Sequence, residues 1–169
     1  MERVTRGRVA GREELSVGEI GAVHHVGLTV SDLDRSVEFY TEQLGCEVVM
    51  RQEKRGGYLA AIVGYPDASV RMAHLTDPGR RIVIELFEYL VPERRTTELE
   101  PRLVGNPHVC FLVDDLDAVH ARLAAAGVDF LSPPIDVDTG ANKGGAGVYL
   151  RDPDGIIVEL FQPGPGGTT

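Results

Sequence analysis

The chain is short of cysteine, of long apolar runs and of positive charge. Its two cysteines, Cys46 and Cys110, do not form a CxxC arrangement. We expect both to be buried free thiols within strands, which suits a reducing cytosol. No apolar run approaches the roughly 18 residues that a membrane helix needs, and residues 1–20 hold no hydrophobic segment of the signal-peptide type. We therefore predict a cytoplasmic protein without a membrane partner.

Basic residues are outnumbered: 17 Lys and Arg stand against 26 Asp and Glu, so the formal net charge is −9. This balance argues against nucleic acid and anionic membranes as partners, because both bind basic patches. A chain of 169 residues with 43% hydrophobic residues is sufficient for one compact domain or for two small fused modules. The acidic surface serves solubility and says little about a substrate.

What the sequence does contain is an internal repeat. The segments "HVGLTVSDLD" at 25–34 and "HVCFLVDDLD" at 108–117 share the pattern H-V-x-h-x-V-x-D-L-D, where h is apolar. Each is followed by a helical pattern that ends in glycine. Each half then closes on a strand that carries an acid, "IVIELFE" or "IIVELFQ". Two copies of one supersecondary unit are the simplest explanation.

Each half is predicted to run strand–helix–strand–strand–strand. In the first half, period-2 alternation predicts a strand at 25–30, and Ser31 is expected to cap the helix that ends at Gly45. Asp114 takes the place of Ser31 in the second half. The other predicted elements are second strands in "CEVVMRQE" and "VDFLSPP", a helix at 58–64, a strand at 69–75, a turn at 77–79 and a hairpin that turns at 152–155.

This order of elements predicts an α+β fold of two βαβββ modules, with the helices covering one face of the sheets. The segment "PERRTTELEPR" is rich in charge and reads as a linker between the modules. The predicted divisions are an N-terminal extension at 1–20, a first module at 21–92, a linker at 93–104, a second module at 105–163 and a tail at 164–169.

Two histidines and two glutamates hold equivalent places in the two halves. Strand side chains alternate between faces, so His25 and His108 point away from the residues that pack under the helices. Glu85 and Glu159 each interrupt an apolar strand, where an isolated buried carboxylate costs several kcal/mol. A single strand histidine is more often structural, but the match in both copies favours a shared site. If the modules bring the four side chains together, one divalent cation neutralises both carboxylates, and Zn, Ni, Co, Mn or Fe(II) suits such ligands.

These motifs resemble the vicinal oxygen chelate superfamily, which includes glyoxalase I, methylmalonyl-CoA epimerase, extradiol dioxygenases and bleomycin-resistance proteins. The resemblance covers about residues 22–163 and rests on "HHVGLTVSDLDRSVEFYTEQLG", "VIELFE", "PHVCFLVDDLDA" and "VYLRDPDGIIVELF". It implies two modules that curl into an eight-stranded cup around one metal ion. It also implies a homodimer, with the cup formed either within one chain or between swapped modules. The ligands that it implies are His25, Glu85, His108 and Glu159.

The ligand set resembles that of glyoxalase I and the epimerases most, which implies a metal-dependent lyase or isomerase. Such enzymes remove a proton next to a carbonyl from a small substrate whose two neighbouring oxygens chelate the metal ion (Ni, Zn, Co or Mn). The cation then holds the enediolate intermediate. Glu159 or Glu85 is the implied base, with Glu159 favoured. Tyr89 stands where glyoxalases tend to carry an asparagine that contacts glutathione, which argues against that thiol.

Two other functions stay open. An extradiol, ring-cleaving dioxygenase would use His25, His108 and Glu159 as an Fe(II) triad. Tyr149 matches the tyrosine of those enzymes in position, although simple hairpin parity predicts its side chain on the helix side. Against ring cleavage, residues 132–147 lack the acid–base histidine that those enzymes carry. The third possibility is a non-catalytic drug-binding or resistance protein, a kind of relative that generally lacks the metal ligands.

The glycine-rich loop "TGANKGGAG" at 139–147 has two interpretations. Asn142 and Lys143 at its centre could cover the cup and contact an anionic substrate group, or the loop could be a flexible connector. It is not a phosphate-binding loop, because the strand–GxxxxGK[ST]–helix pattern is missing. We predict that His74 and His120 are structural, His74 because it has no counterpart in the repeat.

Overall fold

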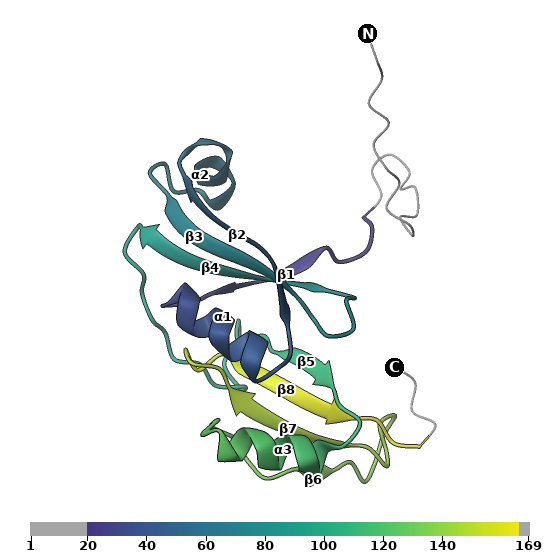
Figure 1. The fold of residues 1–169 in the computed structure, drawn as a ribbon. Coiled ribbons are helices and arrows are strands. Elements are labelled where there is room, and N and C mark those ends of the chain that lie inside the picture. The colour runs from purple at the N-terminus through teal and green to yellow at the C-terminus, as the bar shows by residue number, and fades with distance from the viewer. Residues whose placement is uncertain (1–19, 166–169) are drawn as a thin grey trace.

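The structure is a computed structural model that describes residues 20–165 of the chain. The predicted N-terminal extension, apart from residue 20, and the last part of the predicted tail at 166–169 lie outside the described residues. Two four-stranded sheets make up the architecture, one from each half of the chain (Figure 1). None of the helices in the described part of the chain is long and apolar enough to cross a membrane.

The first half forms sheet 1, in which the strand order is β1-β4-β3-β2. β1 runs parallel to β4, whereas the β4–β3 and β3–β2 pairs are antiparallel. The elements of this half are β1 (His25–Thr29), α1 (Leu33–Glu42), β2 (Glu47–Arg55), α2 (Gly57–Val63), β3 (Ser69–Thr76) and β4 (Val83–Val91). The predicted helix at 58–64 and strand at 69–75 are confirmed.

The second half forms sheet 2 with the equivalent order, β5-β8-β7-β6, and again with a parallel first pair. Its elements are β5 (Val109–Leu112), α3 (Leu116–Ala125), β6 (Ile135–Asp136), β7 (Ala146–Arg151) and β8 (Ile157–Gln162). The repeat therefore corresponds to two βαβββ modules, and the predicted α+β fold class is confirmed.

The predicted strand in "VDFLSPP" is wrong. Only Phe130 forms an isolated bridge there, to Leu150. The second strand of this module is instead the two-residue β6, which follows the two prolines. Pro133 and Pro134 have no backbone N–H to donate to a neighbouring strand, so the ladder cannot continue through them. Sheet 2 consequently has a shorter outer strand than sheet 1.

The helix caps also differ from the prediction. Asp32, not Ser31, is the N-cap of α1, and its carboxylate accepts hydrogen bonds from the backbone N–H groups of Asp34 and Arg35. Asp115, not Asp114, is the N-cap of α3. A carboxylate at this position satisfies free N–H groups of the first turn and suits the positive end of the helix.

A single apolar core joins the two modules. In each sheet, the residues under the helices alternate with residues on the opposite face, which we call the open face. The core contains helix-side residues of both sheets, such as Ile84 and Leu86 from β4 and Val158 and Leu160 from β8. Tyr40 of α1 and Leu123 of α3 are fully buried in the same core. Because both sheets contribute their helix sides to this core, their open faces are turned away from it.

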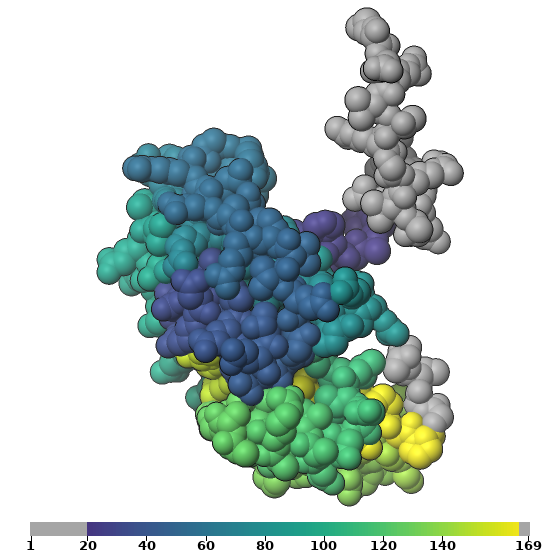
Figure 2. Space-filling view, in the orientation of Figure 1, coloured from purple at the N-terminus to yellow at the C-terminus, as the bar shows by residue number. Residues whose placement is uncertain are grey.

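Polar contacts add to the join between the modules. The Asp154 carboxylate accepts hydrogen bonds from the backbone N–H and the hydroxyl of Ser31, at 2.8 and 2.5 Å, and pairs with the Arg35 guanidinium at 2.6 Å. The Tyr40 hydroxyl donates to Asp152 over 3.3 Å. These contacts attach the β7–β8 turn to α1, the helix that lies between the two sheets in Figure 1. Figure 2 shows the first module seated directly on the second.

The two cysteines do not match the expectation of a buried strand position for both. Cys46 is buried but precedes β2, whereas Cys110 lies on β5 and is exposed in the single chain. Cys110 takes the exposed position because it follows His108 by two residues and shares its open face. Both are free thiols, as predicted.

Candidate functional site

The first candidate half-site is centred on Glu85, near the start of β4. Its side chain is 13% exposed and contacts two imidazoles. The His25 Nε2 atom lies 3.3 Å from one carboxylate oxygen, and the His74 Nε2 atom lies 2.6 Å from the other. His25 also meets His24 through its Nδ1 atom at 2.8 Å, so Nε2 is the nitrogen that faces the carboxylate. The first half-site is thus a carboxylate held between two histidines.

His74 is predicted from the sequence to be structural, but in the structure it contacts Glu85 in the first half-site. His74 lies directly across from Glu85 in the β3–β4 ladder, so both side chains project from the open face. Its ring stacks with that of His25 at a centroid distance of 6.3 Å. Strand parity alone could not have found this residue, because the β3–β4 register is not encoded in any pattern of the repeat.

The second half-site is centred on Glu159 of β8. The His108 Nε2 atom lies 2.9 Å from the carboxylate, and the Glu159 side chain is 24% exposed. Tyr149 lies directly across from Glu159 in the β7–β8 ladder, and its ring centroid is 5.0 Å from that of His108. Cys110 is the β5 residue beside Glu159. The predicted pairing of a first-strand histidine with a last-strand glutamate is therefore present in each module.

The parity argument that turned Tyr149 to the helix side is wrong. It assumed a two-residue turn, whereas Asp152 and Ile156 close a three-residue loop through the hydrogen bond from the Asp152 N–H to the Ile156 carbonyl. Gly155 ends this loop with φ +84°, the left-handed conformation that such loops require. The additional residue shifts the register by one position, which turns Tyr149 to the face of Glu159.

Neutral donors surround Glu159. Burial, and secondly the nearby Glu159 charge, raise the pKa of the Tyr149 hydroxyl. Although Cys110 is exposed as a residue, partial desolvation of its thiol, and secondly the Glu159 charge, raise the pKa of that thiol to about 12. Both groups are therefore protonated at neutral pH, and neither adds charge to the half-site.

Neither Glu85 nor Glu159 has a lysine or arginine partner among the described residues. Across residues 20–165, neither carboxylate forms an ion pair with a lysine or an arginine; their only partners within pairing distance are histidines. Two partly buried carboxylates with imidazoles beside them form a donor set that fits a divalent cation. This chemistry agrees with the expectation from the sequence.

One chain does not bring the two half-sites together. The described part of the chain contains no group of three or more His, Cys, Asp or Glu side chains placed to hold a metal ion. The reason is the shared core: the half-sites lie on open faces that turn away from it. Of the two arrangements left open by the sequence, a complete cup within one chain does not match this geometry.

Asn142 and Lys143, the residues predicted from the glycine-rich loop, are exposed on the turn before β7. Among the described residues, neither side chain forms a hydrogen bond or an ion pair with a member of the half-sites. The backbone of the turn is held by hydrogen bonds from the Gly144 N–H to the Val137 carbonyl and from the Gly145 N–H to the Asn142 carbonyl. In the single chain, this loop behaves as a connector.

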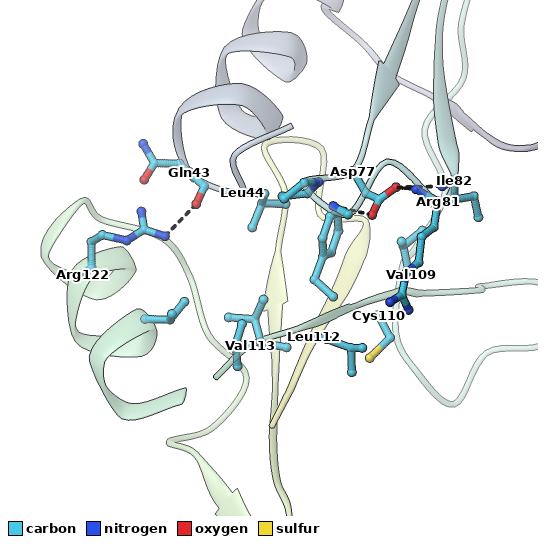
Figure 3. Close-up of a pocket in the computed structure, with 15 residues that line it drawn as sticks. Gln43, Leu44, Asp77, Arg81, Ile82, Val109, Cys110, Leu112, Val113 and Arg122 are labelled. Carbon is cyan, nitrogen blue, oxygen red and sulfur yellow. Dashed lines mark hydrogen bonds between the residues drawn. The ribbon is translucent and has the colours of Figure 1, made fainter. Parts of the chain in front are cut away.

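A cleft of about 490 Å³ lies between the modules, and its lining includes Cys110 of the second half-site but none of the paired histidines and glutamates (Figure 3). Val109 and Phe111 of β5 line one wall, and the turn from Asp77 to Ile82 lines another. The Asp77 carboxylate accepts hydrogen bonds from three backbone N–H groups of its own turn and thereby holds the turn in place. Among the described residues that line this cleft there is no histidine–glutamate pair.

Comparison with known proteins identifies the family. The model of the Glyoxalase/Bleomycin resistance protein/Dioxygenase superfamily matches residues 22–160, and the chain belongs to this superfamily. A solved glyoxalase family protein from Bacillus cereus has the same fold, with a TM-score of 0.77 and 21% identity over 90% of this chain and all of that one.

Two curated relatives are enzymes. A 2-epi-5-epi-valiolone epimerase from an Actinomyces species is 33% identical over 83% of this chain and 79% of its own length. A lactoylglutathione lyase from Pseudomonas aeruginosa is 32% identical over 82% of this chain and 81% of its own length. The relatives of this chain thus include an isomerase and a lyase of one superfamily.

Proposed function

We propose that the protein is a metal-dependent lyase or isomerase that removes a proton next to a carbonyl. The observation that carries this proposal is the matched pair of half-sites, in which each module presents one histidine beside one glutamate that has no lysine or arginine partner in residues 20–165. The names of the two enzyme relatives support the same reaction class, because an epimerase and a lactoylglutathione lyase can both begin with loss of such a proton.

The complete site is proposed to form between two copies of the chain. His25 and Glu85 of one copy would face His108 and Glu159 of the other, since the two open faces of a single chain diverge. A symmetric dimer makes this contact twice and forms two equivalent sites. Among the described strands, β1 and β5 lie at the edges of their sheets, so each sheet presents an edge on the side of its histidine.

A divalent cation bound by these four residues would supply positive charge beside two neighbouring oxygens of a substrate. The protein's own contribution is to hold the donors in place. The two imidazoles on Glu85 restrain its carboxylate, and the Tyr149 ring packs against His108. The substrate is proposed to be a small molecule with adjacent carbonyl and hydroxyl oxygens.

Glu159 is the better candidate for the base. Its side chain is the more exposed of the two, at 24% against 13%, and it contacts one imidazole where Glu85 contacts two. A carboxylate that acts as a base must be able to leave its resting contacts and accept the substrate proton. The less restrained carboxylate suits this role, whereas Glu85 suits a fixed one.

Reconstitution with metal tests the proposal. The purified protein, stripped with a chelator and reloaded in turn with Ni, Zn, Co, Mn or Fe(II), is analysed for bound metal. Exchange of the α-hydrogen of 2-hydroxycyclohexanone, and of the hemithioacetal of methylglyoxal and glutathione, is followed by NMR in D₂O.

We expect one metal ion per chain and α-hydrogen exchange with at least one substrate. The exchange rate should fall about a hundredfold or more in Glu159→Gln. Glu47→Gln, on an exposed pair with Arg80, is the matched control. Absence of metal binding and exchange would overturn the proposal.

The position of Tyr149 supports a second candidate function. Its place across from Glu159 on the open face fits the extradiol dioxygenase alternative, in which Fe(II) is held by His25, His108 and Glu159. Glu85 would then be a fourth ligand, and the second carboxylate, with no assigned task. Oxygen uptake with catechol as substrate, measured on the Fe(II)-loaded protein, separates the two functions: ring cleavage requires oxygen, whereas α-hydrogen exchange does not.

A further inference from the structure

A row of aromatic side chains extends from Glu85 along the open face of sheet 1. Phe87 and Tyr89 follow Glu85 at alternate positions of β4, and their ring centroids lie 6.0 Å apart. The Tyr65 ring, which follows α2, meets the Tyr89 ring edge-on at 6.1 Å. We call Phe87, Tyr89 and Tyr65 the aromatic row. It begins beside the carboxylate of the first half-site and leads away from it.

The short helix α2 closes the far end of this face. Val70 and Met72 lie across from Tyr89 and Phe87 in the β3–β4 ladder and therefore belong to the open face. Both are nevertheless buried, and neither belongs to the core that joins the modules. Leu59 and Ala60 of α2 are buried as well, and α2 packs against the adjacent strand β2 at this end of the sheet (Figure 1). The far end of the aromatic row is therefore apolar.

The strands offer little positive charge to a bound molecule. In the described chain, the strand residues of the two open faces include only two cations, Lys54 and Arg151. Lys54 lies across from Val70, at the end of β2 near α2. Arg151 already donates to the carbonyls of Leu99 and Gly155. The remaining open-face strand residues near the half-sites are uncharged and include Thr29, Met50, Gln52, Cys110, Leu112 and Phe161.

These features define which molecules the face can take up. A glutathione conjugate carries two carboxylates and a net negative charge, and it would need several fixed cations to replace the water around them. The overall charge of −9 adds repulsion. A compact uncharged molecule has no such need. Aromatic rings carry negative charge on their faces and attract polarised C–H bonds, so the row suits a ring or short carbon skeleton laid flat on it.

We propose that the aromatic row is the substrate-binding wall for a compact, uncharged α-hydroxyketone or dicarbonyl, whose carbon skeleton packs on Phe87 and Tyr89, and not for a glutathione conjugate. This inference rests on the function proposed above, because it places the two substrate oxygens at the cation that Glu85 would help to hold. Tyr65 and α2 limit the length of the molecule that fits.

Calorimetric titration of the metal-loaded full-length protein tests this specificity. The uncharged probe is 2-hydroxycyclohexanone and the anionic probe is S-lactoylglutathione. We expect the uncharged probe to bind at least tenfold more tightly. Tyr89→Leu and Phe87→Leu, which keep apolar volume but remove the rings, are expected to weaken its binding about five- to tenfold. Tyr89→Phe keeps the ring and should bind as the unaltered protein does.

Two controls separate binding from folding and from metal loss. Tyr58→Leu changes a tyrosine of α2 that is 65% exposed and lies outside the aromatic row, and should leave binding unchanged. Metal content is measured on every variant and should stay constant. The inference is overturned if S-lactoylglutathione binds equally well or better, or if the leucine variants bind the uncharged probe normally.

Failure of the two proposals can be told apart. If the protein takes up no metal and exchanges no α-hydrogen, the proposed function fails, and the substrate wall fails with it. If metal binds and the glutathione hemithioacetal undergoes exchange while 2-hydroxycyclohexanone does not bind, only the specificity inference is wrong.

Discussion

His74 and Tyr149 occupy equivalent positions in the two modules, each directly across an antiparallel strand pair from a glutamate. His74 lies across from Glu85, and Tyr149 lies across from Glu159. His74 contacts its glutamate at 2.6 Å, whereas Tyr149 packs its ring against His108. The repeat has therefore diverged at this position, and the two carboxylates experience different restraints.

Loss of the His74 side chain should weaken metal binding. His74→Leu removes one of the two imidazoles that hold the Glu85 carboxylate, and changes to groups that orient a ligand typically reduce metal affinity about 10- to 100-fold. We expect a rise of about tenfold in the metal dissociation constant, measured by competition with a chromophoric chelator. His120→Leu, which alters a histidine packed against Phe130 at 4.3 Å, is the control. Unchanged affinity in His74→Leu would show that His74 does not position the carboxylate.

The contacts of Asp154 should contribute strongly to stability. Its carboxylate, with 15% side-chain exposure, receives hydrogen bonds from two groups of Ser31 and pairs with Arg35. Asp154→Ala leaves these donors without their partner, and we expect a loss of about 2–3 kcal/mol in the free energy of unfolding. Urea denaturation measures it.

The exposed ion pair of Arg80 with Glu47 provides the comparison for Asp154. Both of its side chains are more than half exposed, at 69% and 60%. Pairs of this kind contribute little, so Arg80→Ala should change the free energy of unfolding by less than about 1 kcal/mol. Equal effects of the two substitutions would mean that the contacts between the β7–β8 turn and α1 stabilise the fold no more than an exposed ion pair does.

Asp152 should give stability an unusual dependence on pH. Burial raises the pKa of its carboxyl from 3.8 to about 6, despite hydrogen bonds from the Ile156 and Asp154 N–H groups that act in the opposite direction. The folded state then binds the proton more tightly than the unfolded state. Its contribution to stability is therefore fully present below about pH 4 and is lost as pH rises to about 6.

Asp152→Asn isolates this effect. Asparagine can accept the same two backbone hydrogen bonds and can donate to Tyr40, but it carries no charge. We expect the variant to be more stable than the unaltered protein by about 2–3 kcal/mol above pH 7, with the difference vanishing near pH 4. Urea denaturation at pH 4, 6 and 8 gives the difference directly. A variant that is less stable at pH 8 would contradict the assignment.

Strand alternation and the repeat were sufficient to predict the histidine–glutamate pairs. Strand alternation predicts His25 and Glu85 on the faces opposite the helices, and the structure adds the parallel β1–β4 register, in which Gly27 lies across from Glu85 and His25 is two residues away. The fold class followed from the order of the elements. These features depend on local patterns, which the sequence encodes directly.

The features that were missed depend on the lengths of loops and on distant contacts. Tyr149 changed face because Asp152–Ile156 forms a three-residue loop, and His74 joined Glu85 through a register that local sequence does not show. The orientation of the modules rests on pairs such as Tyr40 with Asp152, 112 residues apart. Such contacts arise only when the whole chain is packed.

Metal binding by a mixed dimer tests the central claim that two chains build one site. One chain carries His25→Ala and Glu85→Gln, the other carries His108→Ala and Glu159→Gln, and the heterodimer is isolated through two different affinity tags. Its two sites would then contain either all four substitutions or none. A heterodimer of two differently tagged chains that both carry His25→Ala and Glu85→Gln is the control.

We predict that the mixed heterodimer retains one tightly bound metal ion, half the content of the unaltered dimer, and that the control heterodimer and both parental homodimers retain none. A mixed heterodimer that binds no more metal than its parents would contradict a site shared between chains.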